Sequence, residues 1–345
     1  MPLKLGSLEL PSTIVQSPMA ACSDLPFRLV ARRRGLKYCY TEMVSAQALV
    51  RSNEKTMRLL KTVAEDKPLG TQLLGCDPAM MGEAAAMLDE MGFASIDLNL
   101  GCPVRKVTSN GEGSALLKEP VLAEQVFKSV RRAVKRAAFT VKMRKGFEDP
   151  SGEQAVELAK RAEGAGVSWI TVHGRTQQQM YTGRSDYDAI GKVKAAVRIP
   201  VLGNGDVISV DDARRLQSTS GCDGIMIGRA GLGNPWVYEN LRRGLESGGA
   251  GECPPPLFVP TVAERRDALL EHLDLELEHC GERQAAVNLR RIVMWYTVAL
   301  PNAKPLRVAV CQTMDVPLIR RMIEDYFNAL PADVPAPQTP VLLAE

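Results

Sequence analysis

Eight short apolar segments recur along the first two thirds of the chain, and patterns typical of helices separate them. The segments are Thr13–Ser17, Lys37–Met43, Leu69–Leu74, Ser95–Leu100, Phe139–Arg144, Trp169–His173, Pro200–Gly203 and Gly224–Gly228. Their starts are spaced by about 25–30 residues, the length of one strand and one helix, apart from a longer interval between the fourth and the fifth. Such alternation predicts parallel strands, and the apolar character of several segments is expected of strands buried on both faces.

Eight strand–helix units within about 240 residues predict an α/β fold of the (β/α)8 TIM-barrel type. The alternative is a doubly wound open sheet, which requires a reversal of strand order that a sequence does not display. The length of 345 residues exceeds what one hydrophobic core usually serves, so a second, smaller domain is expected.

The pattern changes after residue 243. A segment rich in glycine and proline follows, and then Thr261 and Glu264 have the spacing of a helix-capping box. Helical periodicity continues from there to Gly281, and two further helices are expected in a small bundle. The predicted organisation is a barrel over 1–243, a linker over 244–260, helices over 261–281, 288–300 and 316–330, and a proline-rich tail over 331–345.

Composition excludes several classes of protein. An apolar content of 45% against 24% charged residues excludes a disordered chain, and no apolar run approaches a membrane span. The start of the chain lacks a secretory signal, so we expect a cytoplasmic protein. We expect no membrane and no metal; the sequence leaves the oligomeric state open, with a monomer favoured. None of the eight cysteines forms a C-x-x-C motif, which favours free thiols. A net charge of +3 neither requires nor excludes a nucleic-acid partner.

Seven of the eight predicted strands carry polar or otherwise unusual residues within their last residues or directly after them. They are Ser17–Ala20, Gln72, Asn99–Pro103, Lys142 with Arg144, His173–Thr176, Asn204–Asp206 and Gly228–Arg229. In a barrel the carboxyl ends of the strands lie at one end, where the loops carry the chemistry. We therefore expect an active site at that end.

Three features of this set have a chemical interpretation. Glycines at 203, 205 and 228 with Arg229 favour a phosphate site after strands seven and eight, although glycines also serve tight turns. Lys142 interrupts an apolar strand and favours a bound anion such as a reduced flavin; a snorkelling or paired lysine is the alternative.

Cys102 differs from the other cysteines because it lies in a Gly-Cys-Pro turn at the predicted active end. A thiol with an ordinary pKa is protonated at pH 7 and can act as a general acid as well as a nucleophile. The alternative is a small buried apolar residue. Gln72 and His173, taken singly, are equally consistent with structural hydrogen bonding.

Taken together and in order, these motifs resemble those of the tRNA-dihydrouridine synthases, and within that family the bacterial B-type branch. The segments are SPMA at 17–20, QLLG at 72–75, LNLGCPVRKV at 98–107, GSALL at 113–117, VKMRKG at 141–146, VHGRT at 172–176, GNGD at 203–206 and IGRAGLGNPW at 227–236. The resemblance covers residues 10–243 and continues more weakly into the helical domain. One departure is Lys145-Gly146, where the family often has Thr-Gly.

The resemblance implies an enzyme that reduces the C5=C6 bond of uridines in tRNA, with FMN as cofactor and NADPH or NADH as reductant. Hydride would pass from flavin N5 to uracil C6, and Cys102 would protonate C5. Cofactor contacts would come from Pro18, Met19, Ala20, Gln72, Lys142, His173, Asn204, Gly205, Asp206, Gly228 and Arg229. Asn99 and Arg144 would hold the uracil, and the helical domain would bind the RNA.

The charge of the helical domain is polarised along the sequence. Residues 261–282 are mainly acidic, whereas the basic residues Arg290, Arg291, Lys304, Arg307, Arg320 and Arg321 follow within 288–321. We interpret this second part as an RNA-binding face, with Arg105 and Lys106 of the barrel adding to it. A solvated charged face is the alternative.

Two other functions fit parts of this pattern. One is an FMN-dependent oxidoreductase of a free pyrimidine, similar to dihydroorotate or dihydropyrimidine dehydrogenase, which would not need a basic helical domain. The other is an RNA-binding module with an inactive barrel, against which Cys102 and Lys142 both argue. Which uridine is reduced is left open by the sequence.

Overall fold

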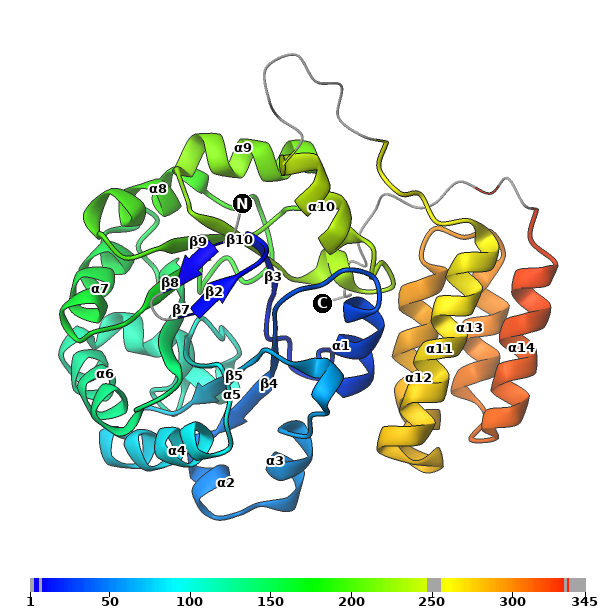
Figure 1. Cartoon of the computed structure of the whole chain (residues 1–345), viewed down its shortest axis with the longest axis horizontal. Helices are drawn as coiled ribbons and strands as arrows, with labels where there is room; N and C mark the ends of the chain where they lie inside the picture. The colour runs from blue at the N-terminus through cyan, green and yellow to red at the C-terminus, as the bar shows by residue number, and fades with distance from the viewer. Residues whose placement is uncertain (1–2, 6–7, 247–255, 332–333, 335–345) are drawn as a thin grey trace. The chain divides into compact units, whose positions relative to one another are not determined.

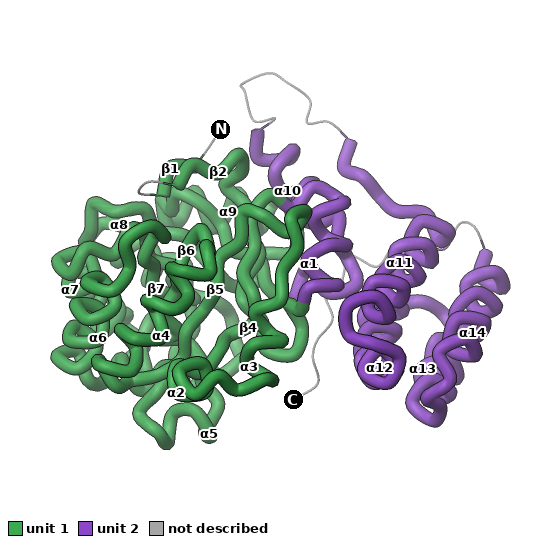
Figure 2. The backbone as a smooth tube through the Cα atoms, turned by 60° about the horizontal axis from the view of Figure 1, so that its bottom comes forward, with its two compact units in different colours: residues 1–24, 37–228 green, residues 25–36, 229–345 purple. Residues whose placement is uncertain are grey.

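The computed structural model describes the chain except for residues 1–2, 6–7, 247–255, 332–333 and 335–345. Parts of the predicted linker and most of the predicted tail therefore lie outside the described residues, as does Cys253. The chain forms two compact units (Figure 2). One comprises Met1–Asp24 and Lys37–Gly228, and the other comprises Leu25–Leu36 and Arg229–Glu345.

The first unit contains an eight-stranded parallel barrel (Figure 1). Its strands are β3 (Ile14–Gln16), β4 (Cys39–Ser45), β5 (Leu69–Leu74), β6 (Ser95–Leu100), β7 (Ala138–Gly146), β8 (Trp169–Thr176), β9 (Val201–Asn204) and β10 (Gly224–Ile227). They pair in sequence order from β4 to β10, and β10 then pairs with β3. The N–H of Gln16 donates to the carbonyl of Tyr38 at 3.0 Å, which joins β3 to the start of β4. The TIM-barrel prediction is confirmed, and the open-sheet alternative is wrong.

Helices of this unit follow the strands, and several of them begin at a polar side-chain cap. They are α2 (Ala46–Val50), α3 (Glu54–Leu59), α4 (Pro78–Glu90), α5 (Arg105–Thr108), α6 (Pro120–Ala133), α7 (Glu153–Gly164), α8 (Tyr187–Ala196) and α9 (Val210–Ser220). Asp77 accepts from the N–H of Met80 at 2.7 Å, and Asp186 accepts from that of Ala189 at 3.0 Å. These caps satisfy helix N–H groups that have no partner within the helix.

A hairpin that the sequence analysis missed closes one end of the barrel. Its strands, β1 (Leu3–Leu5) and β2 (Leu8–Leu10), pair antiparallel and lie over the barrel in Figure 1. Their buried leucines pack with Ala138 and Trp169, the first residues of β7 and β8. Because this apolar cover occupies the amino ends of the strands, the opposite end is the one that holds the polar side chains.

The second unit consists of helices. They are α1 (Leu25–Arg32), α10 (Val237–Glu246), α11 (Val262–Cys280), α12 (Glu282–Thr297), α13 (Ala303–Cys311) and α14 (Val316–Asn328). Thr261 caps α11 as predicted: its hydroxyl accepts from the N–H of Glu264 at 3.2 Å, and the Glu264 carboxylate accepts from the N–H of Thr261 at 2.7 Å. The sequence analysis placed the start of α12 six residues late. It also missed α13, which is short and contains Pro305.

Helix α1 lies between two barrel strands in the sequence, yet it packs on the C-terminal helices. The ring of Phe27 meets the edge of Trp295 with centroids 6.3 Å apart. Arg33 and Arg34 both form ion pairs with Glu271 of α11, at 2.9 and 2.7 Å. A barrel helix is therefore part of the core of the helical unit.

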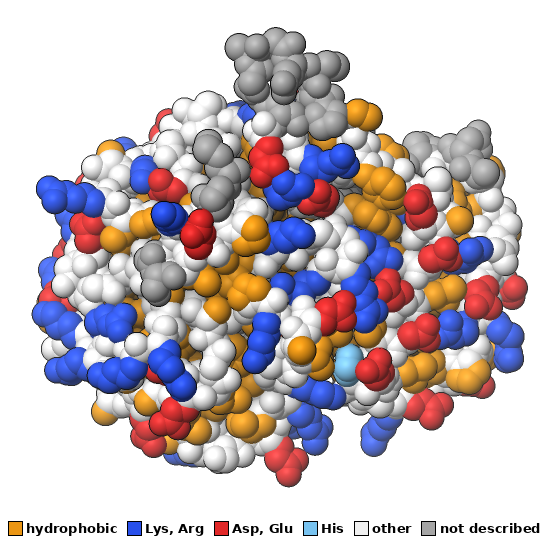
Figure 3. Space-filling view, viewed as in Figure 1, with side chains coloured by type: hydrophobic (Ala, Val, Ile, Leu, Met, Phe, Trp, Pro, Cys, Tyr) orange, Lys and Arg blue, Asp and Glu red, His pale blue; other side chains and the backbone are white. Residues whose placement is uncertain are grey.

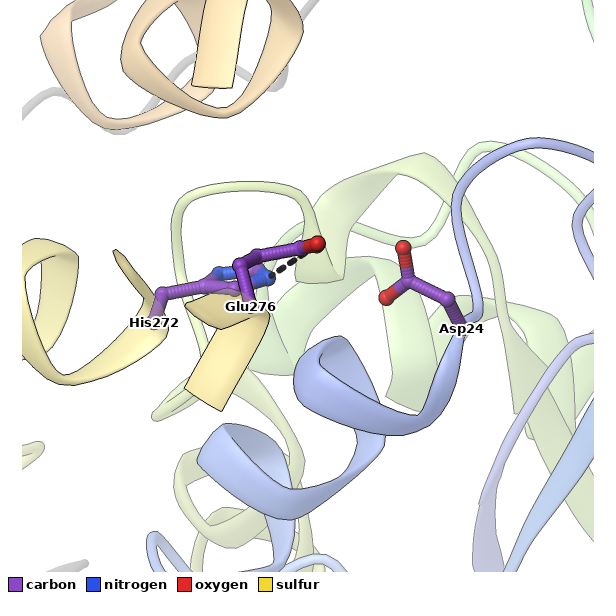
Figure 4. A group of neighbouring side chains, drawn as sticks. All are labelled: Asp24, His272 and Glu276. Carbon is purple, nitrogen blue, oxygen red and sulfur yellow. Dashed lines mark ion pairs between the residues drawn. The ribbon is translucent and has the colours of Figure 1, made fainter. Parts of the chain in front are cut away.

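Buried polar side chains join α11 to α12 within this unit. His272 and Glu276 lie one turn apart on α11, with Nε2 and Oε1 3.9 Å apart (Figure 4). The amide of Asn288 on α12 donates to the other carboxylate oxygen of Glu276 at 2.8 Å. None of the described helices has the length and apolar character needed to cross a membrane.

Candidate active site

Strand register brings the predicted site residues of the barrel side by side, in two adjacent levels of the sheet. Asn99 of β6 pairs with Lys142 of β7, and Arg144 of β7 pairs with His173 of β8. His173 in turn pairs with Asn204 of β9. These residues lie at or near the carboxyl ends of their strands, so the end of the barrel opposite the hairpin carries the polar groups. Arg229 follows Gly228 directly but belongs to the second compact unit.

Cys102 lies on the loop after β6, and its backbone is held from two sides. The N–H groups of Gly101 and Cys102 donate to Asn99 Oδ1 at 3.0 and 2.8 Å. The Ser114 hydroxyl donates to the Cys102 carbonyl at 2.9 Å. Burial raises the pKa of the Cys102 thiol, against the opposing effects of the Val104 N–H and the charges of Arg144 and Lys142. The thiol is therefore protonated at neutral pH.

Lys142 points its ammonium into the site without a protein partner. No described residue forms an ion pair or hydrogen bond with it. Burial, followed by the charge of Arg144, lowers the pKa of Lys142 to about 8, while Asp97 and Cys102 act in the opposite direction. At pH 7 Lys142 is charged in most molecules, so it is suited to an anionic ligand.

Gln72, Asp97 and Asn99 form a buried network beside Cys102. Gln72 donates from Nε2 to Asp97 Oδ2 at 2.7 Å and accepts at Oε1 from Asn99 Nδ2 at 2.8 Å. Thr140 donates to the other Asp97 oxygen at 2.6 Å. Burial raises the pKa of Asp97 to about 6. The sequence analysis missed Asp97, although a carboxylate two residues before Asn99 in an apolar strand was a signal of an inward-facing charge.

Arg144 is buried and ties two loops of the site together. Its Nε donates to the Gly101 carbonyl, and its Nη1 donates to the carbonyls of Thr176 and Met180, each at 2.8 Å. Burial lowers the pKa of Arg144 to about 10, which leaves it charged at neutral pH. The ring of Tyr181, half exposed, lies 5.7 Å from the guanidinium. Sequence analysis did not single out Tyr181, because a lone aromatic in a polar loop carries no pattern.

At the predicted phosphate end, the carboxylate of Asp206 faces protein groups. It accepts from Arg175 Nη2 at 2.8 Å and from the N–H of Ser185 at 2.7 Å. Asn204 donates to the Met226 carbonyl at 2.7 Å. These contacts hold the loop after β9, so a phosphate would meet the backbone of this loop rather than the Asp206 carboxylate.

The glycines near this loop serve different purposes. A Cβ at Gly203 would come within 2.9 Å of Leu216, so Gly203 permits packing of α9 on β9. Gly205 has a φ of +125°, and a Cβ there would collide with Ser185. At Gly228 the nearest atom to an added Cβ is Met19 Sδ, 3.9 Å away, an ordinary van der Waals distance.

The loop after β3 is held close to its strand. The carbonyl of Met19 accepts from the N–H groups of Cys22 and Ser23, both at 3.0 Å. Pro18 and Met19 are partly buried, and Ala20 is exposed. His173 is partly buried and accepts at Nδ1 from the N–H of Arg175 at 3.3 Å, which places its ring proton on Nε2 when the imidazole is neutral.

Lys145, where the sequence departs from the family pattern, lies outside this network. Its ammonium donates to Asp186 at 2.8 Å and to the Pro150 carbonyl at 2.9 Å. Asp186 also caps α8, so Lys145 stabilises the start of that helix. At this position the lysine therefore makes a structural contact and does not alter the arrangement of the site residues.

Residues 15–325 match the family model described as dihydrouridine synthase. The chain belongs to this family. A probable tRNA-dihydrouridine synthase of Rickettsia conorii is 37% identical, over 95% of this chain and 97% of that protein. The tRNA-dihydrouridine synthase B of Pseudomonas aeruginosa is 36% identical, over 94% and 96%. A probable tRNA-dihydrouridine synthase 1 of Synechocystis is 39% identical, over 91% and 86%. The resemblance noted in the sequence is thereby confirmed, and B-type enzymes are among the relatives of this synthase-family chain.

Solved structures with the same barrel have far lower sequence identity. A histamine dehydrogenase from Rhizobium superposes with a TM-score of 0.56 at 13% identity, over 79% of this chain and 50% of that one. A 2-naphthoyl-CoA reductase has a TM-score of 0.56 at 11% identity, over 70% and 51%. At such identities the similarity establishes the barrel fold that this dihydrouridine synthase family member shares with them, and nothing finer.

Proposed function

We propose that this chain reduces the C5=C6 bond of uridines in tRNA to dihydrouridine, with FMN as cofactor and NADPH as reductant. The observation that carries the proposal is Cys102, a protonated thiol on a loop held by Asn99, in the same site as the ammonium of Lys142. Family membership and the names of the relatives support the tRNA substrate. A cytoplasmic, monomeric protein without metal remains our prediction.

The residues of the site fit a flavin mononucleotide. Lys142 offers a cation without a protein partner among the described residues, and Gly228 lies beside Met19 without crowding. Pro18, Ala20, Gln72 and His173 would complete the cofactor contacts, and Asn204, Gly205, Asp206, Gly228 and Arg229 would surround the phosphate. When bound, the flavin supplies the hydride for the reduction.

The side chains of the chain itself would orient and protonate the uracil. Cys102 donates its proton to C5 and recovers it from solvent, since the loop carrying it is only partly buried. Three donors of Arg144 already bind carbonyls, which leaves Nη2 for a uracil oxygen. Asn99 is engaged at both ends of its amide, and its weakest contact, to Met43 Sδ at 3.5 Å, is the one that a substrate would replace.

The basic residues predicted to bind RNA divide into two groups. Arg307 donates to Thr297 at 2.9 Å, Arg291 donates to Asn288 at 2.6 Å, and Arg320 pairs with Asp274. The remaining basic residues, Arg290, Lys304 and Arg321, are exposed and pair with no acid among the described residues. We propose that this second group contacts tRNA phosphates, together with Arg105 and Lys106, which are exposed on α5.

The side of the helical unit formed by α1 and α11 is unsuited to RNA. A groove there is lined by Asp267, Glu271, Asp274 and Glu278, with Arg33 and two leucines. Acidic side chains gather over the helices of this unit in the view of Figure 3. Since phosphates are repelled by carboxylates, we place the tRNA on the side of α12 to α14.

The direct test is anaerobic reoxidation of the NADPH-reduced protein, followed by flavin absorbance. We expect rapid reoxidation by unmodified tRNA and none by free uridine or orotate. Cys102→Ala should lose reduction of tRNA by about 100-fold or more, the usual contribution of a general acid, while Cys311→Ala, an exposed thiol, serves as the control. Reoxidation by a free pyrimidine would identify a small-molecule enzyme instead, and a protein without flavin would refute the proposal.

A further inference from the structure

A directed chain of hydrogen bonds leads from a fully buried carboxylate to the loop of Cys102. Asp97, with no solvent exposure, accepts from Gln72 Nε2; Gln72 Oε1 accepts from Asn99 Nδ2. Asn99 Oδ1 then accepts from the N–H groups of Gly101 and Cys102. Two side chains, Gln72 of β5 and Asn99 of β6, therefore connect Asp97 to the backbone of Cys102.

The donors and acceptors at the two ends of this series of hydrogen bonds decide how the amides of Asn99 and Gln72 are oriented. Backbone N–H groups only donate, so the oxygen of Asn99 must face Gly101 and Cys102, and its nitrogen must face Gln72. Gln72 must then present its oxygen to Asn99 and its nitrogen to residue 97. A group that accepts is thus required at position 97, and an ionised carboxylate is a strong acceptor.

We propose that Asp97 is a positioning residue for Cys102, acting through the amides of Gln72 and Asn99. Without an acceptor at position 97, Gln72 has no fixed orientation, and the Asn99 contact that holds the loop is weakened. The thiol then loses its place over the carbon that it protonates. This inference rests on the proposed function for its catalytic consequence, but the arrangement of the loop is independent of the substrate.

Asp97 can also affect the reaction in a second way, which has to be distinguished from the positioning of Cys102. The charge of Asp97 also acts on Lys142, whose pKa it raises. Removing the carboxylate could therefore weaken cofactor binding without any effect on the thiol. The two routes differ in one respect: positioning requires Cys102, whereas an effect through Lys142 does not.

The experiment combines a set of variants with two readouts on the full-length flavin-loaded protein. Asp97→Val removes the acceptor, and Asp97→Ser, with a hydroxyl too short to reach Gln72, provides a milder form should the valine variant not fold. Asp97→Asn keeps an accepting oxygen. Asp66→Val is the matched control, because Asp66 is an equally buried acid of the barrel unit that bonds Thr62 and Cys39.

The first readout is the rate at which iodoacetamide alkylates Cys102, measured by mass spectrometry of its peptide. We expect Asp97→Val and Asp97→Ser to alkylate several-fold faster than the unchanged protein, because the loop is released. Asp97→Asn and Asp66→Val should match the unchanged protein. Equal rates for all four variants would overturn the proposal, whether or not the protein reduces tRNA.

The second readout is the turnover number with tRNA. Asp97→Val and Asp97→Ser should lower kcat by roughly 10- to 100-fold with little change in KM, as expected for a misplaced catalytic group. When the chain also carries Cys102→Ala, each of these changes should lower kcat by less than about a further twofold, because the thiol on which they act is gone. A full additional loss in that background would assign the effect to Lys142 or to the cofactor and uracil contacts of Gln72 and Asn99, and would contradict positioning of the thiol. Absence of any tRNA reduction by the unchanged protein would instead refute the proposed function.

Discussion

Burial acts in opposite directions on two ionisable residues of the site. It raises the pKa of Cys102 and lowers that of Lys142 to about 8, because a weakly polar environment disfavours the charged form of each group. At pH 7 the thiol keeps its proton, and most Lys142 side chains keep their charge. Burial therefore favours the proton donor, whereas Lys142 stays a cation at pH 7 in spite of burial.

Replacing Lys142 tests its predicted contact with the flavin. Lys142→Met removes a charge-assisted hydrogen bond worth about 1.5–3 kcal/mol, so FMN should bind roughly 10- to 100-fold more weakly. Equilibrium dialysis with flavin fluorescence measures this affinity. Lys145→Met is the matched control on the same strand, since Lys145 bonds Asp186 and lies outside the group of site residues.

The same contact predicts how flavin affinity depends on pH. A lysine with a pKa of about 8 is charged below that pH and loses its charge as the pH rises through it. Affinity for FMN should thus be nearly constant below about pH 7 and fall by about fivefold between pH 8 and pH 9. Lys142→Met should lack this decrease; an identical decrease in the variant would assign the pH dependence to another group.

Among the helices, charge distribution distinguishes α11 from those that follow it. On α11 the exposed acids form a stripe, and Arg320 of α14 is neutralised by one of them, Asp274. Arg290 on α12 and Arg321 on α14 have no such acid among the described residues. The surface of α11 is therefore mainly acidic, whereas Arg290 and Arg321 provide basic positions on α12 and α14.

Reversing these two charges tests the RNA face. Arg290→Glu combined with Arg321→Glu should weaken tRNA binding by roughly tenfold or more, and lower the slope of log affinity against log salt by about 1 per lost phosphate contact. Filter binding over a range of salt concentrations measures both. Arg266→Glu, on α11 beside Asp267, should change neither value. Unchanged binding in the double variant would show that the RNA lies elsewhere.

For the whole molecule, the division into compact units differs from the division of the sequence. Helix α1 precedes the second barrel strand, but Phe27 is 4% exposed because it packs on Trp295. Arg33 and Arg34, directly after this helix, pair with Glu271 of α11. The C-terminal helices are therefore not an appendage that can be removed without consequence for residues 25–36.

Truncation makes this dependence measurable. A chain ending at residue 246 exposes Phe27 and loses the packing of α1, at a cost of about 3–5 kcal/mol, so its melting temperature should fall by about 10 °C or more. A chain ending at residue 334 should have the same melting temperature as the full-length protein. Circular dichroism melts of the three forms decide the matter; an unchanged melting temperature for the shorter form would show that α1 is stable without the bundle.

Local patterns predicted the strands well and the helical unit less completely. β5 and β6 begin and end where the predicted segments do, although each contains polar residues of the site network. The hairpin β1–β2 was missed because three-residue strands are too short for alternation to be recognised. Helix α13 was missed because Pro305 and its short length resemble a loop.

The amino-acid sequence by itself determined the barrel and the set of polar residues at its active end, because strand period and strand-end position are local properties. It also placed Cys102, Lys142 and Arg144 among those residues. Only the tertiary structure decided that Asp97 belongs to the network, that Arg144 holds two loops, and that α1 packs with the C-terminal helices. The physical reason is that hydrogen-bond direction and side-chain burial depend on neighbours far away in the sequence, which no local pattern specifies.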